Sequence, residues 1–144
     1  MQMWVLLHYK IPREPSAPRV YVWRKLKRLG ALLVQDAVWV LPATPRTQEE
    51  FQWLAVEIGE QGGEASVWEA HLTLAGQDEA LVRQFQAQVE TAYHALLVAL
   101  ESPKADLAAL SRRYQQARGQ DYFHSAVGQR VRAALLAARG DQDA

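Results

Sequence analysis

The chain is 144 residues long, 49% of its residues are hydrophobic, and 16 basic residues balance 16 acidic ones at pH 7. A chain of this length and apolar content builds one domain, or one domain with an appendage, around a buried core. The absence of cysteine excludes a disulfide scaffold, a thiolate zinc site and a cysteine nucleophile. The first apolar run is too short for a signal peptide or a membrane span, so we expect a soluble cytoplasmic protein.

The first strand and the first helix are predicted from the spacing of apolar residues. Residues 3–9 form a short apolar run, which is typical of a buried strand. A helix is predicted over residues 19–30, and Pro18 suits its start because a proline there loses no hydrogen bond. We expect Trp23, and Trp39 further on, to lie in the core. The apolar stripe of this helix repeats at helical spacing and consists of Val22, Leu26 and Leu29.

Two strands, a second helix and a last strand follow. The apolar runs at 31–35 and 37–41 are joined by a junction too short for a helix, so an antiparallel pair is predicted. Thr47 and Glu50 have the spacing of a capping box, which predicts the start of the second helix. That helix ends at a glycine pair, and residues 64–69 are predicted to form the last strand.

The order strand–helix–strand–strand–helix–strand is the ferredoxin-like pattern. We therefore predict an α+β domain over residues 1–75, with an antiparallel sheet covered by both helices on one face. Residues 76–144 carry only helical patterns and are predicted to form a bundle of about three helices packed on that domain. The last helix is expected to end at Gly140, and the three helices are expected to begin at Asp78, at Ser102-Pro103 and at Ser125.

The balanced charge hides a segregation along the chain. Up to Arg46 the charged residues are mostly basic, whereas from Thr47 to Ser102 they are almost all acidic. Such segregation indicates an anionic partner at one face, or head-to-tail attraction between subunits. A solvated face of a charged helix explains the same pattern without any partner.

The basic segment around the first helix is the strongest candidate for a binding site. Arginine and lysine neutralise phosphate charge, and arginine binds an oxyanion in a bidentate manner. We therefore predict that nucleic acid is bound by Arg13, Arg19, Arg24, Lys25, Lys27 and Arg28. Two further clusters would extend a nucleic-acid groove if they shared a face: Arg112, Arg113 and Arg118, and Arg130, Arg132 and Arg139. The alternative is that these arginines pair with the acidic second helix and bind no ligand.

Motifs for catalysis or cofactor binding are not found in the sequence. There is no phosphate-binding Gly-x-x-x-x-Gly-Lys loop and no Gly-x-Ser-x-Gly nucleophile elbow. Asp36 lies between two predicted strands, where a turn aspartate explains it. The histidines are isolated from one another: His8, His71, His94 and His124. We therefore expect no catalytic residue, no bound metal and no cofactor.

Several segments of the sequence together match the pattern of a known family. The most specific is the run from Arg19 to Ala31, which contains Trp23-Arg24, Leu26-Lys27 and Leu29-Gly30. The others are Trp4 to Leu7, Asp36 to Pro42, Glu57-Ile58, Gly62 to Ala65 and Arg118 to Phe123. With these segments the chain resembles the N-terminal domain of the ChrB family of chromate-resistance proteins, and the resemblance covers nearly the whole chain.

This resemblance implies a bacterial transcription regulator of chromate-resistance operons that acts on DNA, and we expect a homodimer without enzymatic activity. The fold is also similar to the central domain of the PaaX repressors and to small CRISPR-associated nucleases. Those nucleases hold a metal with an aspartate at the end of the first strand, where this chain has His8-Tyr9-Lys10. Two alternatives are an accessory protein that binds chromate or another oxyanion, and a metal-dependent nuclease that uses Asp36. Full-length members are expected to sense chromate in a further C-terminal domain, and this sequence ends at Ala144.

Overall fold

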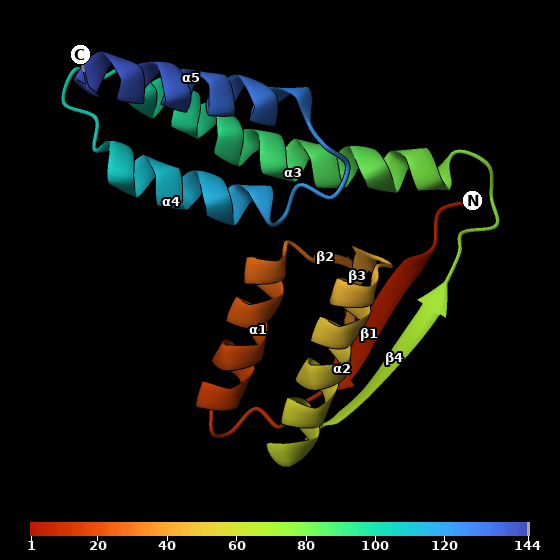
Figure 1. Cartoon of the computed structure of the whole chain (residues 1–144). Helices are drawn as coiled ribbons and strands as arrows, with labels where there is room; N and C mark the ends of the chain where they lie inside the picture. The colour runs from red at the N-terminus through yellow and green to blue at the C-terminus, as the bar shows by residue number, and fades with distance from the viewer. Residues whose placement is uncertain (144) are drawn as a thin grey trace. The chain divides into compact units, whose positions relative to one another are not determined.

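The computed structural model describes the backbone of residues 1–143 and divides the chain into two compact units. The first unit covers Met1–Asp78, and the second begins at Glu79. Figure 1 shows the sheet of the first unit and the long helices of the second. None of the helices in the described part of the chain combines the length and the apolar character that a bilayer crossing needs.

The first unit has the ferredoxin-like order predicted from the sequence. Its four strands pair antiparallel in the order β2-β3-β1-β4, so β1 and β3 are central. The strands are β1 (Trp4–Lys10), β2 (Leu32–Gln35), β3 (Val38–Pro42) and β4 (Glu64–Ala70), and the helices are α1 (Ala17–Leu29) and α2 (Pro45–Glu60). The sequence-based fold class is therefore confirmed.

The core of the first unit lies between the sheet and its two helices. Successive side chains of a strand point to opposite faces, so Val5 and Leu7 of β1 share one face with Leu41 of β3. All three are buried, and α1 and α2 cover this face (Figure 1). The helices contribute the buried residues Val22, Leu26, Phe51, Leu54 and Ile58. Each such side chain contributes about 1.5–3 kcal/mol relative to an exposed position.

The start of α2 differs from the sequence-based prediction. The helix begins at Pro45 and is capped by Thr44, whose hydroxyl accepts a hydrogen bond from the Thr47 N–H at 3.0 Å. Thr47 is buried inside the first turn, and its hydroxyl donates to the Pro42 carbonyl at 2.6 Å. The capping box between Thr47 and Glu50 was therefore wrong, because proline at the first helical position moves the start one turn earlier.

The second unit is built from three helices, as predicted. They are α3 (Gln77–Leu100), which crosses the boundary between the units, α4 (Leu107–Arg118) and α5 (Ala126–Asp143). Their apolar faces meet in one buried cluster of Val89, Tyr93, Leu96, Leu110, Tyr114, Ala117, Val131 and Leu135. A turn from Gly119 to Phe123 precedes α5 and brings Tyr122 and Phe123 within about 6 Å of the Phe85 ring.

Three predicted helix boundaries in this part of the chain were wrong. Asp106, not Ser102, caps α4, and its carboxylate accepts a hydrogen bond from the Ala109 N–H at 3.1 Å. Asp78 lies inside α3, where its carboxylate accepts a hydrogen bond from the Trp4 indole at 2.9 Å instead of capping the helix. Gly140 does not end α5, which continues to Asp143.

Candidate functional site

Helix α1 carries a buried apolar stripe on one side and cationic side chains elsewhere. The stripe consists of Val22, Leu26 and Leu29, and the left-handed Gly30, with φ at 77°, ends the helix. Lys25 is half-buried at the edge of this stripe. The other basic residues of the predicted site are exposed: Arg13 in the loop before α1, and Arg19, Arg24, Lys27 and Arg28 on the helix. The structure thus places all six predicted residues on α1 or in the loop that leads into it.

The contact between α1 and the acidic helix α2 is made by a tyrosine. The Tyr21 hydroxyl donates a hydrogen bond to the Glu57 carboxylate. This bond, with some desolvation, raises the pKa of Tyr21, while the nearby Arg28 charge acts in the opposite direction. Among the described carboxylates, none forms an ion pair with Arg19 or Arg24. The acidic helix therefore does not neutralise those two arginines.

The other two predicted arginine clusters lie in the second unit. Arg112, Arg113 and Arg118 are exposed on α4, and Arg130, Arg132 and Arg139 are exposed on α5. Their joint use with α1 in one groove stays a prediction.

A pocket opens beside α1 where the central strand outruns one neighbour. Pairing of β1 with β3 stops at His8 and Val38, whereas pairing of β1 with β4 continues to Lys10 and Glu64. The last two residues of β1 therefore have no strand beside them on the β3 side. The space is a pocket of about 1100 Å³ between the end of β1, the turn joining β2 to β3, and the first two turns of α1.

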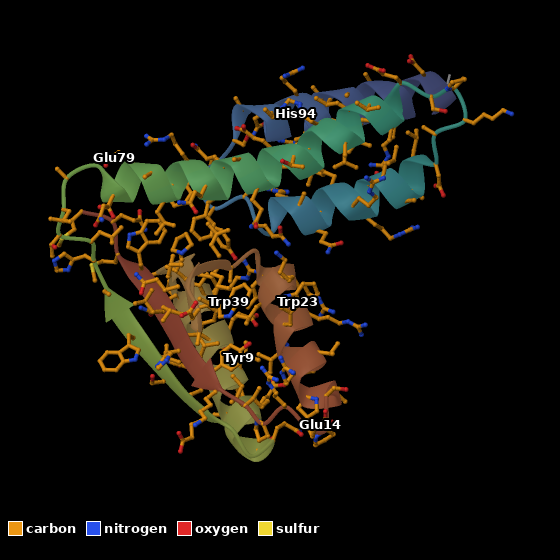
Figure 2. The ribbon with its side chains drawn as sticks, turned by 180° about the vertical axis from the view of Figure 1, so that it is seen from behind. Tyr9, Glu14, Trp23, Trp39, Glu79 and His94 are labelled. Atoms are coloured by element: carbon orange, nitrogen blue, oxygen red, sulfur yellow. The ribbon has the colours of Figure 1, made fainter. Side chains whose placement is uncertain are left out.

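Three aromatic side chains line this pocket. Tyr9 follows Leu7 on the helix-covered face of β1, and Trp39 lies directly beside Leu7 on β3. Trp23 comes from α1, and Figure 2 shows it across from Tyr9 and Trp39. Trp39 is 7% exposed, as expected for a core residue, but Trp23 is 53% exposed. The assignment of Trp23 to the core was wrong, because its position on the helix falls outside the stripe of Val22, Leu26 and Leu29.

Polar and charged groups complete the pocket wall. Arg19 and Arg24 reach it from α1, and Lys10 from the end of β1. Two carboxylates also line it, Asp36 from the turn joining β2 to β3 and Glu64 from the start of β4. Trp39 forms a side-chain hydrogen bond with Tyr9, and Arg19 lies close enough to act on Tyr9 electrostatically. Burial is the main cause that raises the pKa of Tyr9, so its hydroxyl stays neutral at physiological pH. The pocket therefore combines neutral aromatic surface with a cationic side.

Metal-ligating side chains do not gather at this pocket or elsewhere in the part of the chain that the structure describes. No group of three or more histidine, cysteine, aspartate or glutamate residues there has a geometry that could hold a metal ion. His8, Asp36 and Glu64 all line the pocket, together with the cationic Lys10 at the end of β1. The charge of Lys10 repels a divalent cation there.

The fold and this site define the chain as a ferredoxin-like α+β protein with a basic, partly aromatic surface on its first helix. Residues 19–115 match the family model described as "Protein ChrB, N-terminal", and the chain belongs to this family. The resemblance stated from the sequence is therefore confirmed.

A curated relative shows how much of a full-length family member this chain represents. Over 107 residues the chain is 29% identical to "Protein ChrB" of Cupriavidus metallidurans. The alignment covers 73% of this chain but only 32% of that protein, so the chain spans about a third of its relative. No solved structure gave a significant match.

The sequence analysis missed the pocket as a site. Its aromatic members are far apart in the sequence and meet only because β3 is shorter than β1 at this end. One signal was available: Arg19 and Trp23, and likewise Val20 and Arg24, are four residues apart and share one side of the helix. That side is separate from the apolar stripe, so its residues are not needed for the core.

Proposed function

We propose that this chain is the DNA-binding part of a chromate-resistance transcription regulator, and that the exposed side of α1 contacts the phosphate backbone. Membership of the ChrB family supports the chromate-resistance context. The observation that supports DNA binding is the set of exposed cations on α1, of which Arg19 and Arg24 have no described carboxylate partner.

The physical argument concerns like charges on one helix. Lys27 and Arg28 follow Arg24 by three and four residues and are therefore its neighbours on the helix surface. Each like-charge pair of this kind destabilises a helix by about 0.2–0.5 kcal/mol, and a phosphate backbone relieves that repulsion. Lys27 also lies over the Trp23 ring, with its ammonium 5.9 Å from the ring centroid, which orients it on this surface.

In this proposal the chain binds without catalysis and acts as a homodimer. Phosphate contacts fix the orientation of a protein on the duplex but carry no sequence information. A second copy doubles the number of such contacts and matches the two-fold symmetry of many operators. Recognition of the operator is assigned to no residue here.

The test is a charge-reversal pair with a matched control. The variant Arg24→Glu with Arg28→Glu places two negative charges on the exposed side of α1. The control, Arg83→Glu with Lys104→Glu, makes the same change in net charge at exposed positions of the second unit outside all three arginine clusters. Binding of a DNA duplex from the promoter region of the chromate-resistance operon is measured by fluorescence anisotropy, and folding is measured by circular dichroism.

We expect the α1 variant to lose duplex binding at a salt concentration where the control still binds, with both variants folded. Equal weakening by the two variants would show that only net charge matters and would refute the α1 interface. If the α1 variant unfolds, the single substitution Arg24→Ala replaces it. Unchanged duplex binding by the folded Arg24→Ala variant would also refute the α1 interface.

A further inference from the structure

The pocket beside α1 contains features that phosphate contacts with a duplex do not require. Trp23 exposes half of its surface next to the pocket, and Tyr9 and Trp39 line the opposite wall (Figure 2). A backbone-binding helix needs cations but no exposed aromatic platform. The pocket therefore indicates a second kind of ligand.

The size of the pocket argues for an organic molecule. Pockets that bind cofactors and drug-sized ligands usually have volumes of about 300–1,000 Å³. The pocket here, at about 1100 Å³, is slightly larger than that range. A tetrahedral oxyanion such as chromate would fill only a small part of it and would leave the aromatic walls unused.

The aromatic side of the pocket offers a surface on which a planar ring can stack. Trp23 lines the pocket, whereas Lys27, which lies over the Trp23 ring, does not. Tyr9 and Trp39 come from the neighbouring strands β1 and β3 and line the opposite wall together. Stacking of a base on an aromatic side chain is tolerant of base identity, because every base has a π-face.

The charges of the pocket are arranged to receive an anionic group at one side. Arg19 and Arg24 lie five residues apart on α1, the element that also carries Trp23. Asp36 on the turn joining β2 to β3 and Glu64 at the start of β4 disfavour a second anion on the other sides of the pocket. A ligand with a planar ring and one phosphate therefore fits with the phosphate on the α1 wall.

From this arrangement we infer that the pocket binds a nucleotide, with the base stacked on Trp23 and the phosphate held by Arg19 and Arg24. The nucleotide is either a free nucleoside monophosphate or one unit of a single-stranded nucleic acid, since both present a base joined to a phosphate. This inference goes beyond duplex binding and does not depend on it.

The experiment is isothermal titration calorimetry on the full chain with five kinds of ligand. These are the four nucleoside monophosphates, adenosine, inorganic phosphate, chromate and a single-stranded oligothymidylate. We expect binding of at least one nucleoside monophosphate or of the oligonucleotide, and at least about tenfold weaker binding of adenosine, phosphate and chromate, because each lacks one half of the recognised group. Tight binding of the oligonucleotide alone identifies a strand as the source, and tight binding of a monophosphate identifies a free nucleotide.

A tryptophan pair provides the matched control. Trp23→Ala removes the proposed platform, whereas Trp53→Ala removes an equally exposed tryptophan on α2 that does not line the pocket. Loss of one stacked base corresponds to about 5–150-fold weaker binding, which is expected for Trp23→Ala and not for Trp53→Ala. Arg19→Ala is expected to lower the affinity for the nucleotide at least about fivefold and to leave the affinity for adenosine unchanged.

Two results would overturn the inference. One is the absence of binding by all four monophosphates and by the oligonucleotide. The other is equal affinity for phosphate and for the nucleotide, with Trp23→Ala indistinguishable from Trp53→Ala. Duplex binding is measured separately, on the variant Arg24→Glu with Arg28→Glu. If that variant loses duplex binding while no nucleotide binds the native chain, the proposed function stands and only the nucleotide site is refuted.

Discussion

The two tryptophans of the pocket have different roles although both lie in apolar stretches of sequence. Trp39 is 7% exposed on a central strand, while Trp23 is 53% exposed on the helix. The sequence alone did not separate them, because Trp23 is next to Val22 in the chain but about 100° away from it around the helix. Exposure at this position follows from which residues the sheet covers.

The first prediction compares the stability of the two alanine variants. Trp39→Ala opens a cavity in the core and is expected to lower the free energy of unfolding by about 3–5 kcal/mol. Trp23→Ala removes a largely solvated side chain and is expected to cost about 1 kcal/mol or less. Urea denaturation of the full chain measures both values, and a cost for Trp23→Ala as large as that for Trp39→Ala would contradict this account.

The second prediction concerns the pH dependence of stability at Tyr93. Burial, and then the hydrogen bond to Asp121 at 2.9 Å, hold the pKa of this buried phenol well above its ordinary value of 10.0. Since folding raises this pKa, the stability contributed by the neutral hydroxyl is fully present below pH 10 and is lost as the pH rises further.

Tyr93→Phe tests this directly. At pH 8 the variant is expected to be about 1–3 kcal/mol less stable than the native chain, because Asp121 loses a donor. Above pH 10 the difference between the two proteins is expected to shrink. Urea denaturation at several pH values measures the difference, and a constant gap from pH 8 to pH 12 would be inconsistent with the raised pKa.

At the scale of elements, the close approach of α5 to α3 depends on one glycine. A Cβ built on Gly128 would lie 2.8 Å from Tyr93 Cε2 and 2.9 Å from Cζ. Real Cβ atoms do not approach a ring so closely, so Gly128 allows α5 to pack against the buried Tyr93. Gly140, in the same helix, has no heavy atom within 4 Å of such a Cβ.

The third prediction uses these two glycines as a pair. Gly128→Ala is expected to destabilise the chain by about 1–3 kcal/mol, because the ring or the helix must shift. Gly140→Ala is expected to be neutral or to stabilise the chain by up to about 1 kcal/mol through helix propensity. Thermal unfolding measures the stability of both variants. Equal destabilisation by Gly128→Ala and Gly140→Ala would contradict the explanation by crowding at Gly128.

The type and order of the elements could be predicted from the sequence, but several of their ends could not. The βαββαβ order followed from apolar periodicity, which depends on residues that are close in the chain. Thr47 resembled a cap, yet its hydroxyl is used by the Pro42 carbonyl, and Ser102 binds the Lys104 N–H in a turn instead of starting α4. Such competition among nearby polar groups is decided by the folded backbone.

At the scale of the whole molecule, the basic and acidic segments of the sequence only partly neutralise each other in the fold. The basic helix α1 and the acidic helix α2 lie in one unit, and Tyr21 makes the hydrogen bond to Glu57. The candidate basic residues could be predicted because charge is visible in the sequence. The pocket could not, because it depends on where the β1–β3 pairing stops.

The family assignment also belongs to this scale. The chain matches the N-terminal family model and spans about a third of its full-length relative. The duplex binding proposed for this part is therefore tested on the chain itself.

The most direct test of the proposed function is the salt dependence of duplex binding. Six basic residues lie on α1 or in the loop before it: Arg13, Arg19, Arg24, Lys25, Lys27 and Arg28. If each contacts a phosphate, a plot of the logarithm of the binding constant against the logarithm of the salt concentration has a slope of about −5. Replacement of Arg24 and Arg28 by alanine is expected to reduce the magnitude of that slope by about 2. A slope near zero, or a slope that these two substitutions leave unchanged, would contradict a phosphate-binding surface on α1.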